Sequence, residues 1–303
     1  MAHTSMMKKD RGFTLVELVV VIVVTGIIAS IFAMQYGPAL QNYLAVGRRA
    51  NLTHLADTAL RRMVTEIHTA VPNSLRLLPA SGTAPACLEM VPTSDGGRFR
   101  TAPDTQWDPA NPSTPSKPLD LSGPTLSFDV LTAFTTAPKP GDWVVVGNQN
   151  TADVYDGTSR AQIAAIGAPP ATGSGNLPLG QSRITLKTAK QFPYGYEGGR
   201  FAIVPDSLQA VTYMCSGAGV DAGGTGTGTL TRVVRYDFKA SQACPVAGGQ
   251  SAIVARKVKA CNFVYDPSQG ATQQSGFAQL QLTLADHGES VTLTVGSQVE
   301  NMP

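Results

Sequence analysis

Four cysteines are the first candidates for chemistry, because a thiolate can attack a substrate, bind a metal or form a disulfide. No two of them have the C-x-x-C spacing of a zinc site, and none has a histidine nearby in the sequence. An even number of cysteines in an exported chain predicts one or two disulfides, whereas a cytosolic chain would keep buried free thiols. The candidates are Cys87, Cys215, Cys244 and Cys261.

Four histidines are too widely spread to suggest a metal site or a catalytic pair. His54 and His68 lie fourteen residues apart in a predicted helix, which separates them by about 21 Å along its axis. The motifs GxSxG, HExxH and the P-loop do not occur. The glycine-rich stretch 217–224 has the wrong spacing for a dinucleotide loop, so a hairpin loop is favoured. His3 and His287 are equally isolated in the sequence. Together with the absence of these motifs, this predicts no enzymatic activity and no cofactor.

One stretch offers oxygen ligands of the kind that calcium prefers. Its candidates precede Gly157, but their spacing departs from the EF-hand pattern and no glutamate follows at the closing position. Turns rich in Asn and Asp are commoner than calcium sites, so no metal is predicted and calcium is kept only as a weak alternative. The four candidates are Asn148, Asn150, Asp153 and Asp156.

Glu17 is the most unusual of the chemically active residues, because it lies at the start of an apolar run. The seventeen residues Leu18–Met34 carry no formal charge. At about 1.5 Å per residue they form ~26 Å of helix, nearly the ~30 Å of a bilayer core. A carboxylate in that setting costs about 2.5–3.5 kcal/mol unless it finds a partner. The basic residues before the run, which favour a cytoplasmic N-terminus, are Lys8, Lys9 and Arg11.

The order of features around Gly12 differs from that of a secretory signal peptide. A signal peptide has a shorter apolar core followed by a small-residue cleavage site. Here the small residue precedes the apolar run, so that cleavage after Gly12 would remove the charged leader and keep the helix.

The stretch K-K-x-R-G-F-T-L-V-E resembles the class III leader of type IV prepilins and type II secretion pseudopilins. The resemblance implies that prepilin peptidase cuts after Gly12 and that Phe13 becomes an N-methylated N-terminus. It further implies that Glu17 pairs with the terminal amine of a neighbouring subunit during assembly. The implied partners are other minor and major pilins, through the first helix, together with prepilin peptidase and an inner-membrane assembly platform.

A single long helix is expected over 13–71, in two halves. Residues 13–37 form the half for the membrane or filament core, and 38–71 form an amphipathic half. Gly37 and Pro38 between them predict a kink or a locally melted stretch. The apolar positions of the second half are Leu52, Leu55, Ala59, Leu60, Met63, Val64, Ile67, Ala70 and Val71. The arginines of this half indicate a solvent-exposed helix face rather than a nucleic-acid-binding patch.

Residues 72–303 are expected to form a β-rich periplasmic domain. Thirty glycines and twenty-one prolines separate short, β-branched, alternating segments, as in 277–285, where Ala278, Leu280, Leu282 and Leu284 share one face. The predicted fold class is therefore α+β, the pilin fold, with a long N-terminal helix packed on antiparallel sheet. Flexible loops are predicted near 102–124, 168–180 and 216–229.

The disulfide pairing depends on the strand order. If 209–215, 230–238 and 254–265 are three consecutive antiparallel strands, Cys215 and Cys261 lie on the two outer strands. They are then separated by two strand spacings or about 9.6 Å, which is too far for a disulfide. The pairing therefore stays open, with Cys215–Cys244 as first choice because the 244–253 loop is free to fold back.

Stretches scattered over 72–303, such as "ACLEMVPT" and "LTRVVRYDF", resemble minor pilins from the biogenesis of mannose-sensitive haemagglutinin (MSHA) pili. The resemblance implies a non-enzymatic minor pilin that starts filament assembly. A type II secretion minor pseudopilin, similar to the large J-type proteins, is the alternative within that class. A pilus-tip adhesin is the alternative from another class, and it predicts an exposed aromatic or polar cleft. The net charge of +2 favours no nucleic-acid partner.

Overall fold

The computed structural model describes residues 12–170, 179–194, 198–269 and 275–300, without the side chains of Pro38, Ala39, Gln269 and Glu300. The predicted leader up to residue 11, and most of the predicted loop at 168–180, lie outside these residues. The chain divides into two compact units, the first ending at Ala50 and the second beginning at Asn51. Each unit is described by itself.

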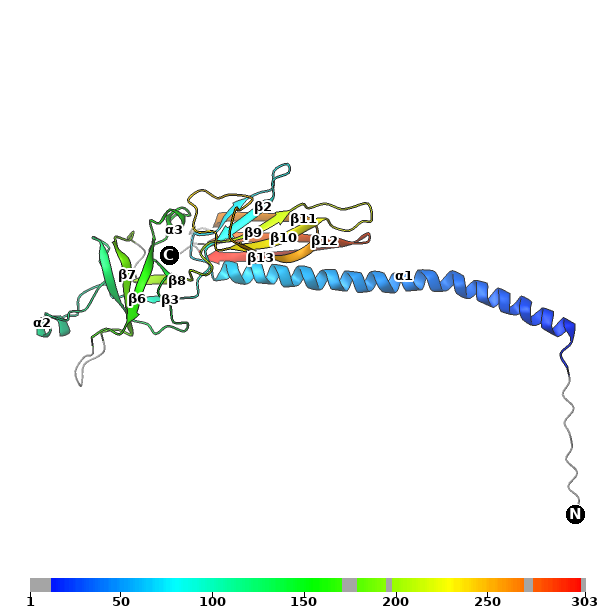
Figure 1. Ribbon diagram of the computed structural model, residues 1–303, viewed down its shortest axis with the longest axis horizontal. Helices are drawn as coiled ribbons and strands as arrows, with labels where there is room; N and C mark the ends of the chain where they lie inside the picture. The colour runs from blue at the N-terminus through cyan, green and yellow to red at the C-terminus, as the bar shows by residue number, and fades with distance from the viewer. Residues whose placement is uncertain (1–11, 171–178, 195–197, 270–274, 301–303) are drawn as a thin grey trace, which may run out of the picture. The chain divides into compact units, whose positions relative to one another are not determined.

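The first helix, α1 (Leu15–His68), is continuous (Figure 1). The expectation of a locally melted stretch at Gly37 and Pro38 is wrong, because the helix runs through both residues. Proline has no N–H to donate to the carbonyl of Met34, so one hydrogen bond is lost, but the helical bonds on either side hold the backbone in place. The helix ends three residues before the predicted boundary at 71.

The last part of α1 buries one face against a sheet of the second unit. Leu55, predicted to lie on this face, is 38% exposed, and Ala56 takes its place. The buried positions recur every three or four residues, as an amphipathic helix requires. They are Leu52, Ala56, Ala59, Leu60, Met63 and Ile67.

A seven-stranded antiparallel sheet covers that face of the helix. Its strands are adjacent in the order β1-β2-β9-β10-β11-β12-β13. The predicted face of β12 is confirmed, since Ala278, Leu280, Leu282 and Leu284 are all buried. The strands are β1 (Arg76–Leu78), β2 (Ala86–Met90), β9 (Val211–Ser216), β10 (Gly228–Val234), β11 (Gln250–Gln269), β12 (Ser275–Asp286) and β13 (Glu289–Glu300).

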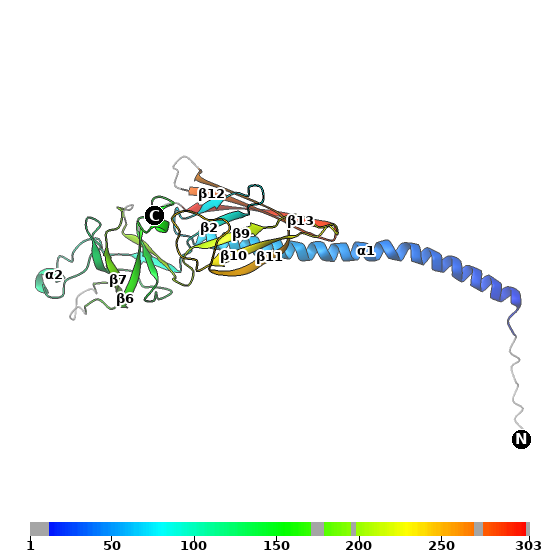
Figure 2. The same cartoon turned by 45° about the horizontal axis from the view of Figure 1, so that its top comes forward.

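Six further strands form a second antiparallel sheet in the order β3-β8-β5-β6-β7-β4, of which Figure 2 shows β6 and β7 apart from the first sheet. They are β3 (Asp95–Arg98), β4 (Thr125–Val130), β5 (Trp143–Val145), β6 (Arg160–Gly167), β7 (Ser182–Lys190) and β8 (Arg200–Val204). The two end strands meet: the Leu131 N–H donates to the Arg98 carbonyl at 2.8 Å, and the Arg100 N–H donates to the Asp129 carbonyl at 2.9 Å. The sheet therefore closes into a small barrel, whose centre holds Phe99, Phe128 and Phe201.

Two of the predicted loops have local structure. The stretch 102–124 contains the short helix α2 (Trp107–Ala110), and the carboxylate of Asp104 accepts the Trp107 N–H at 2.8 Å. The glycine-rich stretch around 217–224 connects β9 to β10 as a hairpin, as expected. The flexibility of both stretches stays a prediction.

A third core joins the barrel to the seven-stranded sheet. Val71, Val91, Val145 and Tyr155 belong to it, the last from the short helix α3 (Asp153–Asp156). The Tyr155 hydroxyl donates to the Ser74 carbonyl at 2.7 Å, and burial raises the pKa of this phenol well above its ordinary value. Tyr155 therefore stays neutral and acts as a fixed donor between the two parts.

A buried ion pair lies beside Tyr155 in this junction. Nε of Arg76 on β1 is 2.7 Å from a carboxylate oxygen of Glu89 on β2, and the guanidinium lies over the Tyr155 ring at 3.5 Å. The Tyr236 hydroxyl donates to the other Glu89 oxygen at 2.8 Å. Arg76 also donates to the carbonyls of Lys239 and Ala240, so the pair ties β1, β2 and the segment after β10 together.

The four cysteines form two disulfides, Cys87–Cys244 and Cys215–Cys261. The first choice, Cys215–Cys244, is wrong, and so is the argument that Cys215 and Cys261 are too far apart, since their Cα atoms are 6.4 Å apart. That argument assumed a flat sheet.

The register explains the short distance between Cys215 and Cys261. Pairing between β10 and β11 ends at Gly228 and Val258, so Cys261 lies beyond the end of the middle strand. In addition β11 contacts β1 and β2, which shows that the sheet curls strongly around β9 and β10.

Peptide mapping of the non-reduced protein is expected to recover two cross-linked pairs, Cys87 with Cys244 and Cys215 with Cys261. Each pair joins positions distant in sequence, separated by 157 and 46 residues. Proteolysis followed by mass spectrometry with and without reductant measures this, and a peptide joining Cys215 to Cys244 would contradict the strand arrangement described here.

Candidate functional site

The predicted processing site lies immediately before α1. Gly12, Phe13 and Thr14 are exposed and not helical, and α1 begins at Leu15. A peptide bond in exposed, non-helical backbone is accessible to a protease. The bond between Gly12 and Phe13 therefore lies where cleavage would leave the helix intact.

Glu17 and Thr14 together cap the start of α1. The Thr14 hydroxyl oxygen accepts the Glu17 N–H at 3.2 Å, and a Glu17 carboxylate oxygen accepts the Thr14 N–H at 3.4 Å. This reciprocal arrangement is a capping box, which satisfies two N–H groups that a helix terminus otherwise leaves unpaired. The sequence analysis missed Thr14, although the spacing T-L-V-E is the signature of this motif.

Gly12 has no structural reason within the chain to be a glycine. A Cβ atom at this position would meet no other atom within 4 Å. An open position tolerates most side chains sterically, so packing among the described residues does not require a glycine here.

The first part of α1 presents a continuous apolar surface. Every large apolar side chain from Phe13 to Met34 is exposed. In the described part of the chain, α1 is the one helix long and apolar enough to cross a membrane. A surface of this size is stable only in a bilayer or against other apolar helices.

The weak calcium candidates take part in hydrogen bonds with other residues of the chain. Asn148 is buried, with its Nδ2 donating to the Pro72 carbonyl and its Oδ1 accepting from the Ser159 hydroxyl at 2.8 Å. Asp153 accepts the Asn150 N–H at 2.9 Å, and Asp156 accepts the Thr158 N–H at 2.8 Å. The bond from the Thr158 N–H to Asp156 is an Asx turn, whereas the bonds of Asn148 and Asp153 have other spacings.

The histidines in the described residues have different partners. His68 is 3.2 Å from the Ser297 hydroxyl, whereas His287 pairs with Asp286 at 2.9 Å. His54 lies on α1. Within the described ranges, no three His, Cys, Asp or Glu side chains gather as metal ligands would.

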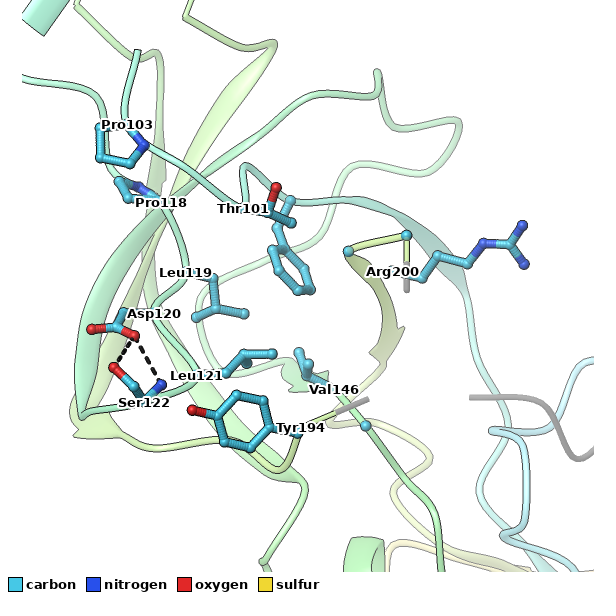
Figure 3. A pocket seen from close by; sticks show the side chains of 14 residues that line it. Thr101, Pro103, Pro118, Leu119, Asp120, Leu121, Ser122, Val146, Tyr194 and Arg200 are labelled. Carbon is cyan, nitrogen blue, oxygen red and sulfur yellow. Dashed lines mark hydrogen bonds between the residues drawn. The ribbon is translucent and has the colours of Figure 1, made fainter. Parts of the chain in front are cut away.

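One end of the barrel holds a pocket of about 510 Å³, shown in Figure 3. Its lining comes from the ends of β3, β5 and β7 and from the residues before β4 and β8. Because neighbouring strands are antiparallel, all of these lie at the same end of the barrel. Phe99, Leu119 and Val146 of the barrel core form its floor, and exposed residues including Tyr194 and Asp120 form its rim. The sequence analysis did not single out this site.

No solved structure matches the chain. Residues 7–33 match the family model of the prokaryotic N-terminal methylation motif, and this similarity supports a class III leader like that of type IV prepilins at this end of the chain.

Proposed function

We propose that this chain is a minor pilin, a structural subunit that initiates assembly of a type IV pilus of the MSHA kind. The observation that carries the proposal is the methylation motif at residues 7–33, together with the exposure of every large apolar side chain from Phe13 to Met34. The scattered resemblance of 72–303 to O-type biogenesis proteins of that pilus supports the choice of system. As a structural subunit the protein has no catalytic role.

The proposed precursor spans the inner membrane once. Lys8, Lys9 and Arg11 keep the N-terminus in the cytoplasm, and the second unit lies in the periplasm. The two disulfides support this placement, because disulfides form and persist in the oxidising periplasm.

The proposed processing begins with cleavage by prepilin peptidase after Gly12. Phe13 becomes the N-methylated N-terminus, one residue before the Thr14 cap. In the filament core, Glu17 exchanges its bond to Thr14 for the charged amine of a neighbouring subunit, where low dielectric strengthens the attraction between opposite charges.

Changing Gly12 to glutamate is expected to block processing, so that the chain retains residues 1–12. The reason is external to the chain, since the backbone at Gly12 has free space around it. Intact-mass measurement of the membrane fraction distinguishes the precursor from a chain starting at methylated Phe13. Gly26→Ala is the matched control, because a Cβ there also meets no atom within 4 Å. A Gly12→Glu chain that starts at Phe13 would contradict the assignment.

Deletion of the gene followed by counting surface pili tests the initiator role. We expect far fewer pili, restored by the wild-type chain supplied from a plasmid. Unchanged numbers of pili would argue against a role in initiation.

A pull-down distinguishes a minor pilin from a type II secretion pseudopilin. The neighbours that it recovers are pilus subunits in the first case and secretion subunits in the second.

An adhesin at the pilus tip is a second candidate, and the barrel pocket is the observation that favours it. Tyr194 stands 65% exposed on the rim of that pocket, as the aromatic cleft of an adhesin requires. An adhesin predicts that mutation of the cleft abolishes attachment while the number of pili stays unchanged.

A further inference from the structure

The barrel pocket has a preformed, apolar floor. Phe99, Leu119 and Val146 are almost fully buried in the barrel core, so their positions are fixed by packing. Gly199 forms part of the wall with a positive φ of 59°, and a Cβ there would lie 2.8 Å from the Thr101 side chain. The hollow is therefore maintained by the fold and needs no ligand to open it.

Tyr194 places an aromatic ring at the rim of this hollow. Among the described residues that follow α1 in the chain, no other aromatic side chain is as exposed. Figure 3 shows its ring beside Leu121 and Val146, with the hydroxyl on the side of Asp120 and Ser122. A solvent-exposed aromatic ring beside the apolar floor of the pocket provides a flat surface on which a ligand can stack.

Asp120 supplies an acceptor on that same side. Its Oδ1 accepts the Ser122 hydroxyl at 2.6 Å and the Ser122 N–H at 2.8 Å. These bonds lower the pKa of the Asp120 carboxyl below its ordinary value, so the group is ionised at neutral pH. Among the described residues these hydrogen bonds engage Oδ1, and none engages Oδ2, so the carboxylate can still accept from a ligand.

The charges of the rim narrow the class of ligand. Among the described residues of the lining Arg200 is the one cation, and its guanidinium points away from the hollow in Figure 3. An acidic ligand would meet an ionised carboxylate without a facing cation, which disfavours it. A purely apolar ligand would leave Asp120, Ser122 and the Tyr194 hydroxyl without new partners.

We propose that the barrel pocket binds a neutral saccharide, with one sugar ring stacked on Tyr194 and its hydroxyls donating to Asp120. A sugar ring has an apolar face of C–H groups and an edge of hydroxyl donors, which matches an aromatic ring beside a carboxylate. A pocket of about 510 Å³ is within the usual range for small ligands. The inference does not depend on the role in the pilus.

The test is a binding measurement on the full chain, in a detergent that carries no sugar. Glucose, galactose, mannose and N-acetylglucosamine are titrated separately to ~10 mM and followed by saturation-transfer NMR. At least one sugar is expected to bind. Tyr194→Ala should weaken that sugar about tenfold, and Tyr194→Phe should retain most of the affinity because the ring remains.

Two further variants complete the test. Asp120→Asn should weaken binding about tenfold, because a neutral amide is a poorer acceptor than a carboxylate. Tyr43→Ala, which removes another exposed tyrosine, from α1, should leave binding unchanged.

The proposal is overturned if none of the four sugars binds, if Tyr194→Ala binds as tightly as wild type, or if the pocket takes up a hydrophobic peptide and no sugar. None of these outcomes changes the pilus count, so the minor pilin proposal is judged separately.

Discussion

Replacing Glu17 by alanine is expected to leave processing and membrane insertion intact while excluding the chain from the filament. The carboxylate lies at the start of an exposed apolar helix, where Thr14 is its hydrogen-bond partner among the described residues. In an assembled filament that site would be surrounded by neighbouring helices, and the charged amine of a cleaved subunit is the partner available to it. The measurement is the amount of chain in sheared pili relative to the membrane fraction.

Glu17→Gln separates the two roles of this residue. Glutamine at the third helical position still completes a capping box, but it carries no charge. If charge pairing drives assembly, Glu17→Gln fails as Glu17→Ala does. Thr14→Val removes only the cap, at a cost of about 1 kcal/mol, and should still assemble. Normal assembly of Glu17→Gln would show that capping suffices and would refute the charge-pairing role.

Removing the carboxylate of Glu89 is expected to cause a large loss of stability in the second unit. Glu89 is 2% exposed and accepts hydrogen bonds from both Arg76 and Tyr236. Glu89→Ala leaves the Arg76 guanidinium, itself largely buried, without its counter-charge. Breaking a buried pair in this way costs about 3–5 kcal/mol. Urea unfolding of the detergent-solubilised chain measures it through the fluorescence of Trp143, which packs on Phe238 in the same junction.

Asp57→Ala is the matched control. Asp57 pairs with Arg61 on α1 at the same 2.7 Å, but the two side chains are 40% and 77% exposed. Water screens such a pair, so its loss should cost less than about 1 kcal/mol. Equal losses for Asp57→Ala and Glu89→Ala would show that burial does not set the strength of the Arg76–Glu89 pair.

The elements of this fold follow from local patterns in the sequence. The strand at 275–286 was predictable because alternation along a strand separates a buried from an exposed face within a few residues. The buried face of α1 from Leu52 to Ile67 was also predictable from its periodicity. The one difference is that Ala56 is buried on this face and Leu55 is exposed. The leader is likewise a contiguous motif, readable without any tertiary contact.

Other features depend on which distant segments become neighbours. Closure of the barrel requires residues 98–100 to meet 129–131, and no periodicity in either stretch specifies that partner. The pairing of Cys215 with Cys261 required the curl of the sheet and the end of β10 at Gly228. The pocket at Tyr194 exists only because five strand ends lie at one end of the barrel. Local propensity acts over a few residues, whereas register, curvature and closure arise from contacts between segments far apart in the chain. The sequence by itself therefore determined the leader, the helix and the strands, and the tertiary structure decided the disulfides, the barrel and its pocket.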